Sequence, residues 1–173
     1  RSSQQGGKVF SFHQKVFQKV FLFHIDHRDK YEGGKRMNIQ KFTQKSVQAV
    51  NELEKIAMEY GNQEIEQEHL LYSLLTQEES LIARLISKMN IDDTLFKEQV
   101  EQALNKRVKV SGGQPYIGQY LNKALISAED EAKRMGDEYV SVEHLFLSMI
   151  KHPNKEIKAI WTEYGITRER FLQ

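Results

Sequence analysis

The sequence predicts an all-α fold made of two tandem four-helix repeats related by a pseudo-twofold axis. Residues 42–98 align without a gap onto residues 117–173, and the tripeptide Glu-His-Leu at 68–70 recurs at 143–145. Apolar residues follow a helical spacing of three and four through both copies. A duplicated helical unit explains both observations, because such a unit buries its apolar face against its own copy.

The first helix of each copy is expected to end at a glycine. In the first copy an apolar stripe runs up to Tyr60 and Gly61 follows, while Gly136 has the same position in the second copy. A glycine after the last apolar residue adopts the left-handed conformation that caps a helix. A short extended piece then precedes the second helix, at residues 64–66 and again at 139–141.

The second helix of each copy begins at the Glu-His-Leu tripeptide. Ser141 is a good N-cap, and Glu68 and Glu143 lie in the first turn, where a negative charge complements the helix dipole. Two further helices follow in each copy. The residues expected to be buried by these helices are Leu70, Leu71, Leu74, Leu75, Leu81, Ile82, Leu85, Ile86, Met89 and Phe96, then Leu145, Phe146, Met149, Ile150, Ile157, Ile160, Trp161, Tyr164 and Phe171.

The chain divides into a leader and a single domain. The predicted parts are the leader at 1–36 and the domain at 37–173, with repeat 1 at 42–105, a linker at 106–117 that contains Gly112, Gly113 and Pro115, and repeat 2 at 118–173. The leader has eight basic and three acidic residues, whereas the rest of the chain has 17 basic and 21 acidic residues. We therefore expect the leader to lie outside the fold.

Two interpretations of the leader stay open. Its aromatic, basic character fits a transit or membrane-surface segment. The alternative is a tag-like or disordered extension, and this is favoured because Met37 opens a sequence that resembles a native start.

Several classes of chemistry lack the residues they need. The absence of cysteine excludes disulfides, thiolate zinc sites and cysteine nucleophiles. Gly113 and Gly118 have the spacing of a phosphate loop, but Gln119 stands where that loop needs lysine. No run of 18 apolar residues occurs, and an acidic body is unsuited to nucleic acid. We expect a cytoplasmic protein that takes no cofactor or metal in this fragment and has neither membrane nor nucleic acid as a partner.

The Glu-His pairs leave one enzymatic alternative, a small helical hydrolase with a bound metal. Adjacent residues on a helix point about 100° apart, and no second histidine stands four residues further on to complete a zinc site. A core or capping role for His69 and His144 is therefore favoured. An inert helical spacer is a third interpretation.

These motifs together resemble a known family. Two copies of a helix ending in Gly, then Ile or Val, then Glu-His-Leu, joined by a Val-Ser-Gly-Gly loop, closely resemble the amino-terminal domain of Clp-type AAA+ unfoldases. The opening segment 37–43 and the linking segment 103–113 are most similar to the ClpB-type disaggregases, with the protease-partnered ClpC and ClpA types as the alternative. The resemblance covers residues 37–173.

The resemblance implies a binding module without catalytic activity. Its partners would be unfolded or aggregated polypeptides, or adaptor proteins. The ATP and magnesium sites would belong to domains beyond Gln173. The isolated domain would be a monomer and the full-length protein a hexamer.

The resemblance also implies four partner-binding positions, which are Thr43, Leu125, Asp137 and Glu143. Leu125 corresponds to an apolar groove position, next to a groove leucine that is replaced here by Ser127. The other three have local alternatives. Thr43 can N-cap the first helix, an interaction worth about 1 kcal/mol, Asp137 can stabilise the turn after Gly136, and Glu143 can complement the dipole of its helix.

Overall fold

The structure is a computed structural model that describes residues 37–173, and the leader at 1–36 lies outside the described residues. η2 (Ile39–Lys41) precedes the first repeat, which contains α2 (Gln44–Asn51), α3 (Leu53–Glu59), β1 (Glu64–Ile65), α4 (Gln67–Thr76), α5 (Leu81–Lys88) and α6 (Asp93–Asn105). The linker ends with β2 (Tyr116–Ile117), and the second repeat contains α7 (Gln119–Arg134), α8 (Val142–Lys151), α9 (Lys155–Tyr164) and α10 (Arg168–Leu172). The predicted all-α fold is confirmed, since each strand has two residues.

The helices of the two repeats correspond, with one local difference. The segment α2–α3 is interrupted at Glu52, whereas the matching α7 is a continuous helix of 16 residues. Glycine ends both segments in the expected way, with φ of +70° at Gly61 and +73° at Gly136. Within residues 37–173, none of the helices combines the length and the apolar character needed to cross a membrane.

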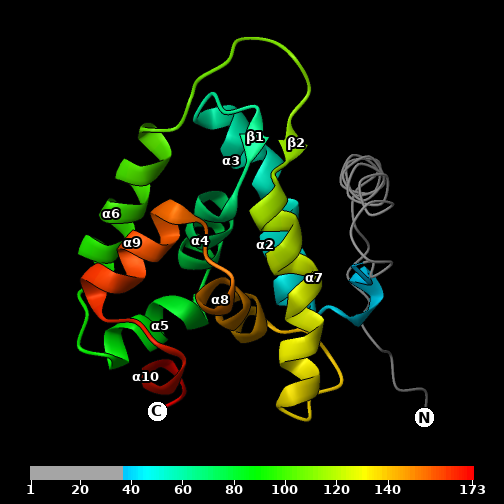
Figure 1. Ribbon diagram of the computed structural model, residues 1–173, viewed down its shortest axis with the longest axis vertical. Helices are drawn as coiled ribbons and strands as arrows, with labels where there is room; N and C mark the ends of the chain where they lie inside the picture. The colour runs from blue at the N-terminus through cyan, green and yellow to red at the C-terminus, as the bar shows by residue number, and fades with distance from the viewer. Residues whose placement is uncertain (1–36) are drawn as a thin grey trace, which may run out of the picture.

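The two repeats share one hydrophobic core. α4 and α8 lie at its centre (Figure 1), and their Leu74 and Phe146 side chains are completely buried. The rings of Phe146 and Phe171 stack with their centroids 4.5 Å apart, and Trp161 of α9 lies 5.0 Å from Phe146. Phe96 of α6 stacks against Trp161 across the repeat boundary. Neither repeat therefore has a complete core of its own.

Some side chains expected in the core lie at its edge. Leu81, Leu85, Ile150 and Tyr164 are packed against the core but only partly buried. The cause is that each lies at the margin of an amphipathic stripe, where helical periodicity does not distinguish full from partial burial.

Short backbone pairings cross between the repeats reciprocally. β1 and β2 pair in parallel with Ile65 opposite Ile117, and an isolated parallel bridge joins Phe42 to Val140. In the repeat alignment Phe42 corresponds to Ile117 and Val140 to Ile65. The start of each repeat therefore pairs with the extended piece of the other, which is the relation expected across a twofold axis.

Candidate functional site

Both histidines close capping boxes at helix N-termini. The backbone N–H of Glu66 donates to Nδ1 of His69 at 2.9 Å, and that of Ser141 donates to Nδ1 of His144 at 2.8 Å. A ring nitrogen that accepts a hydrogen bond from a backbone N–H carries no proton itself. In the neutral ring the hydrogen is therefore on Nε2. The core or capping role predicted for His69 and His144 is thus confirmed.

The second ring nitrogen ties each histidine to the turn that precedes its helix. Nε2 of His69 lies 3.0 Å from Oδ1 of Asn62, and Nε2 of His144 lies 2.8 Å from Oδ2 of Asp137. Both nitrogens of each ring are therefore engaged, and neither ring has a free lone pair for a metal ion. Burial, reinforced by the nearby Arg107 charge, lowers the pKa of His69 to about 4.

The two equivalent turns have different surroundings, and we name them the first turn (residues 60–68) and the second turn (residues 135–143). The first turn is covered by the linker. Nδ2 of Asn62 donates to the Val108 carbonyl at 3.2 Å, and the Val110 N–H donates to the Gly61 carbonyl at 3.0 Å.

Carboxylates of the first turn also hold the second repeat in place. Oε1 of Glu66 accepts the N–H of Tyr120 at 3.1 Å in the first turn of α7, and burial raises the pKa of Glu66. Glu68 is completely buried, and its oxygens accept from Arg107 and from Nδ2 of Asn154, each at 2.5 Å. These acidic side chains are therefore structural.

The second turn is open. Met135 and Tyr139 are 41% and 52% exposed, and the Asp137 and Glu138 side chains are also exposed. Glu143, the equivalent of the buried Glu68, is half-buried, and its carboxylate accepts the Ser141 hydroxyl at 2.7 Å. Within residues 37–173, apolar and acidic side chains thus lie together without the cover that the linker gives the first turn.

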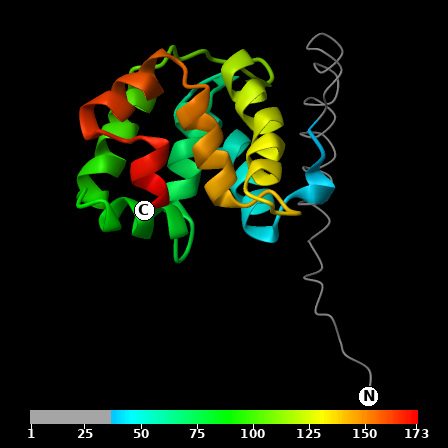
Figure 2. The same ribbon diagram turned by 60° about the horizontal axis from the view of Figure 1, so that its bottom comes forward.

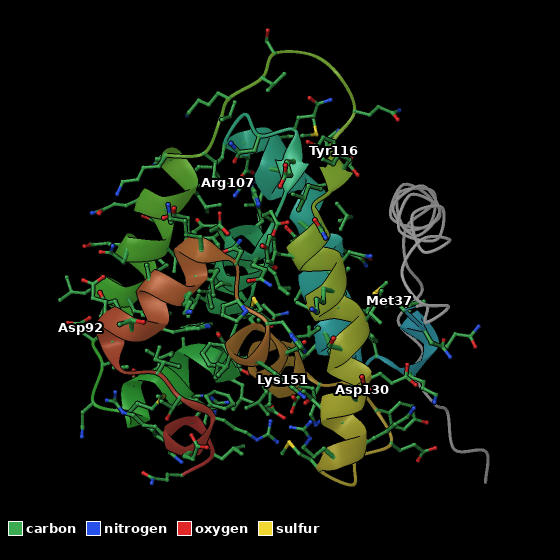
Figure 3. The ribbon with its side chains drawn as sticks, in the orientation of Figure 1. Met37, Asp92, Arg107, Tyr116, Asp130 and Lys151 are labelled. Carbon is green, nitrogen blue, oxygen red and sulfur yellow. The ribbon has the colours of Figure 1, made fainter. Side chains whose placement is uncertain are left out.

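Thr43 is brought to the same place by the crossed pairing. Its N–H donates to the carbonyl of Val140 at 2.9 Å, and the Ser46 hydroxyl donates to the same carbonyl at 2.7 Å. η2 lies beside the C-terminal half of α7 in both views (Figures 1 and 2), where Lys41 forms a 3.0 Å ion pair with Glu129. Figure 3 labels Met37 and Asp130 on this side of the molecule. Three of the four predicted residues, Thr43, Asp137 and Glu143, therefore belong to one region.

Leu125 is separate from that region. Its side chain is completely buried in the core from α7, so in this conformation it packs against the protein interior rather than lining a surface groove. Conversely, sequence reasoning missed Met135, Glu138 and Tyr139. The available signal was that large apolar residues flank a Gly-Asp turn, which places them outside the buried stripe of α7.

Comparison with known proteins gives consistent matches. The family described as Clp repeat (R) N-terminal domain matches residues 41–164. Relatives named chaperone protein ClpB include one from Nitratidesulfovibrio vulgaris, 41% identical over 142 residues, and one from Porphyromonas gingivalis, 39% identical over 137 residues. Each alignment covers 79% of this chain but 16% of the relative, so the chain spans about a sixth of the length of these proteins.

Solved structures share the fold. The Hsp104 N-terminal domain from Candida albicans superposes with a TM-score of 0.65 at 18% identity, covering 76% of this chain and 86% of that one. A ClpV N-domain in complex with a VipB peptide superposes with a TM-score of 0.63 at 19% identity, covering 76% and 82%. Because the family match includes both repeats and the ClpB relatives reach 41% identity, the chain belongs to the Clp repeat (R) N-terminal domain family.

Proposed function

We propose that this chain is the polypeptide-binding amino-terminal module of a ClpB-like, ATP-dependent chaperone, and that the second turn is its contact surface. The module binds unfolded or aggregated polypeptide, or an adaptor protein, without a cofactor. In the whole protein, which we propose to be a cytoplasmic hexamer, ATP and magnesium bind to other domains. The observation that carries this proposal is the difference between two equivalent turns, one covered and one open.

The covered turn supports an extended polypeptide as the ligand. Linker residues 108–110 lie on the first turn outside any helix or strand, with the Val110 N–H donating to the Gly61 carbonyl at 3.0 Å. In the second turn the corresponding residue is Gly136, around which there is open space for a side chain. A backbone segment of a client can therefore occupy a place like that of the linker, with pairing that does not depend on client sequence.

The chemistry of the second turn adds selectivity. Met135 and Tyr139 offer exposed apolar area, as aggregated and unfolded chains do. Asp137 and Glu138 add negative charge, which favours clients with basic residues near their apolar segments. The structurally similar ClpV N-domain has been solved in complex with a peptide, which supports a peptide ligand for this fold.

Binding of a permanently unfolded, fluorescently labelled polypeptide to variants of the chain tests the proposal. Tyr139→Ala is expected to weaken binding by at least about fivefold, because it removes an exposed aromatic anchor. Tyr120→Ala is the matched control, since Tyr120 is 51% exposed and lies at the other end of α7. Its effect should stay below about twofold. Equal effects of the two substitutions would place the contact surface elsewhere.

A further inference from the structure

A second exposed apolar surface lies at the opposite end of the molecule. We name it the linker surface and define it by Lys106, Val108, Lys109 and Val110. Its apolar members, Val108 and Val110, are 80% and 44% exposed. The hydrogen bonds that fix the linker on the first turn use the backbone of Val108 and Val110, and leave these two side chains in solvent. Exposed apolar side chains clustered in this way are typical of interaction surfaces.

The linker surface and the second turn have opposite charge. Residues 106–110 contain three basic residues and no acidic residue, whereas residues 135–139 contain two acidic residues and no basic residue. Within the first stretch Arg107 is already paired with Glu68. On the linker surface, Lys106 and Lys109 are exposed beside the valines. On the second turn, Asp137 and Glu138 are exposed beside Met135 and Tyr139. The two surfaces therefore complement each other both in charge and in apolar character.

One molecule cannot bring its own two surfaces together. They lie at opposite ends of α7 (Figure 1), which has 16 residues and is therefore about 24 Å long. The linker surface of a second copy has no such restriction. A contact between unlike surfaces of identical chains is head-to-tail, and it generates rings where the rotation closes.

We propose that the linker surface of one copy docks on the second turn of the next copy. Val108 and Val110 face Met135 and Tyr139, while the two lysines face the acidic pair. Within each chain the linker backbone is already hydrogen-bonded to the first turn, so the contact between copies uses the exposed side chains of residues 106–110. The proposal rests on the second turn being a binding surface, and it makes the neighbouring copy a competitor of the client polypeptide.

The contact is small and therefore weak between free copies. A handful of side chains on each partner buries less than the roughly 1,200 Å² of a stable interface. Where copies are held in one assembly, the effective concentration rises to about the millimolar range, and a weak contact becomes populated. Client binding would then require the neighbour's linker to leave the second turn.

A charge-swap experiment with the whole chain tests the contact, using sedimentation velocity at low salt over a concentration series that reaches about 1 mM, because the contact is weak between free copies. Lys106→Glu combined with Lys109→Glu makes the linker surface acidic, and Asp137→Lys combined with Glu138→Lys makes the second turn basic. Each double variant alone should self-associate at least about tenfold more weakly than the wild type. An equal mixture should recover association to within about threefold, because each mixed pair again joins unlike charges.

Two controls make the outcome decisive. Circular dichroism and urea unfolding establish that both variants fold, with Glu138→Lys alone as the milder substitute because Asp137 contacts His144. The linker variant keeps an unchanged second turn and should bind unfolded polypeptide at least as well as the wild type, so loss of client binding there would count against the proposed function. A wild type that stays monomeric at every concentration, or a mixture that fails to associate, would overturn the head-to-tail contact. Association that persists in the linker variant would also overturn it, because another segment, such as the leader, would then be the one that binds the second turn.

Discussion

Glu68 and Glu143 are equivalent in the repeat, and we predict that the same substitution has very different effects on them. Glu68 is completely buried and holds Arg107 and Asn154. Glu143 is half-buried and accepts a hydrogen bond from the hydroxyl of Ser141. Glu68→Ala should therefore lower the free energy of unfolding far more than Glu143→Ala.

The magnitudes follow from burial. Removing one partner of a buried ion pair costs about 3–5 kcal/mol, because the other charge is left uncompensated. The Arg107 guanidinium would be that charge, and its Nε atom already has no hydrogen-bond partner among the described residues. At Glu143 the loss is a helix-dipole interaction and a local hydrogen bond, together under about 1 kcal/mol.

Urea unfolding followed by circular dichroism measures both values at neutral pH. A double variant, Glu68→Ala with Arg107→Ala, provides the internal check, since removing the stranded guanidinium should restore part of the loss. The reasoning would be refuted if Glu68→Ala and Glu143→Ala differed by less than about 1 kcal/mol, or if the double variant lost the full sum of the two single effects.

Three further predictions concern the core and the first turn. Leu74→Ala should cost about 2–5 kcal/mol in urea unfolding, and Ile150→Ala should cost less, because Ile150 is only partly buried. The pKa of His69 falls from its ordinary 6.5 to about 4 on folding, so the unfolded chain binds the extra proton between these values. The stability that depends on a neutral His69 is fully present above pH 6.5 and is lost as pH falls toward 4. The free energy of unfolding should fall by at most about 3 kcal/mol over this range. A His69→Gln variant should lack this part of the dependence of the free energy of unfolding on pH. Gly118→Ala should cost about 2–4 kcal/mol in a thermal or urea unfolding experiment, because the new Cβ would lie 2.1 Å from Oε1 of Glu66 and displace that carboxylate from α7. A fully stable Gly118→Ala protein would show that Glu66 is not needed there.

Local signals were enough to predict the repeat and its helix ends. Gly61 and Gly136 adopt the expected positive φ, and Thr43 accepts the Ser46 N–H as the N-cap of α2. The crossed pairing of Phe42 with Val140 could not be predicted, because it depends on how two similar units meet in space. Sequence patterns report neighbours along the chain, and this contact joins residues that are far apart in it.

The candidate site shows the same limit more sharply. The residues Glu-His-Leu are identical at 68–70 and 143–145, yet Glu68 is buried under Arg107 while Glu143 is accessible. Arg107 of the linker and Asn154 of the second repeat, which both donate to Glu68, distinguish them. Leu125 illustrates the converse, because an apolar residue at helical spacing fits a core or a groove equally well, and here it is completely buried.

Duplication explains why one turn can be structural and the other open. A symmetric pair of repeats would have two equivalent turns, but a single chain must pass from α6 to β2, and the linker that does so crosses the first turn. Its residues then replace solvent around Asn62 and Glu68, which become buried parts of the fold. By the same offset, the linker at 106–117 aligns with residues 31–42, of which 31–36 lie outside the described residues. The chain connection thus breaks the symmetry: within residues 37–173 it covers Asn62 and Glu68 and leaves their equivalents Asp137 and Glu143 more accessible to solvent.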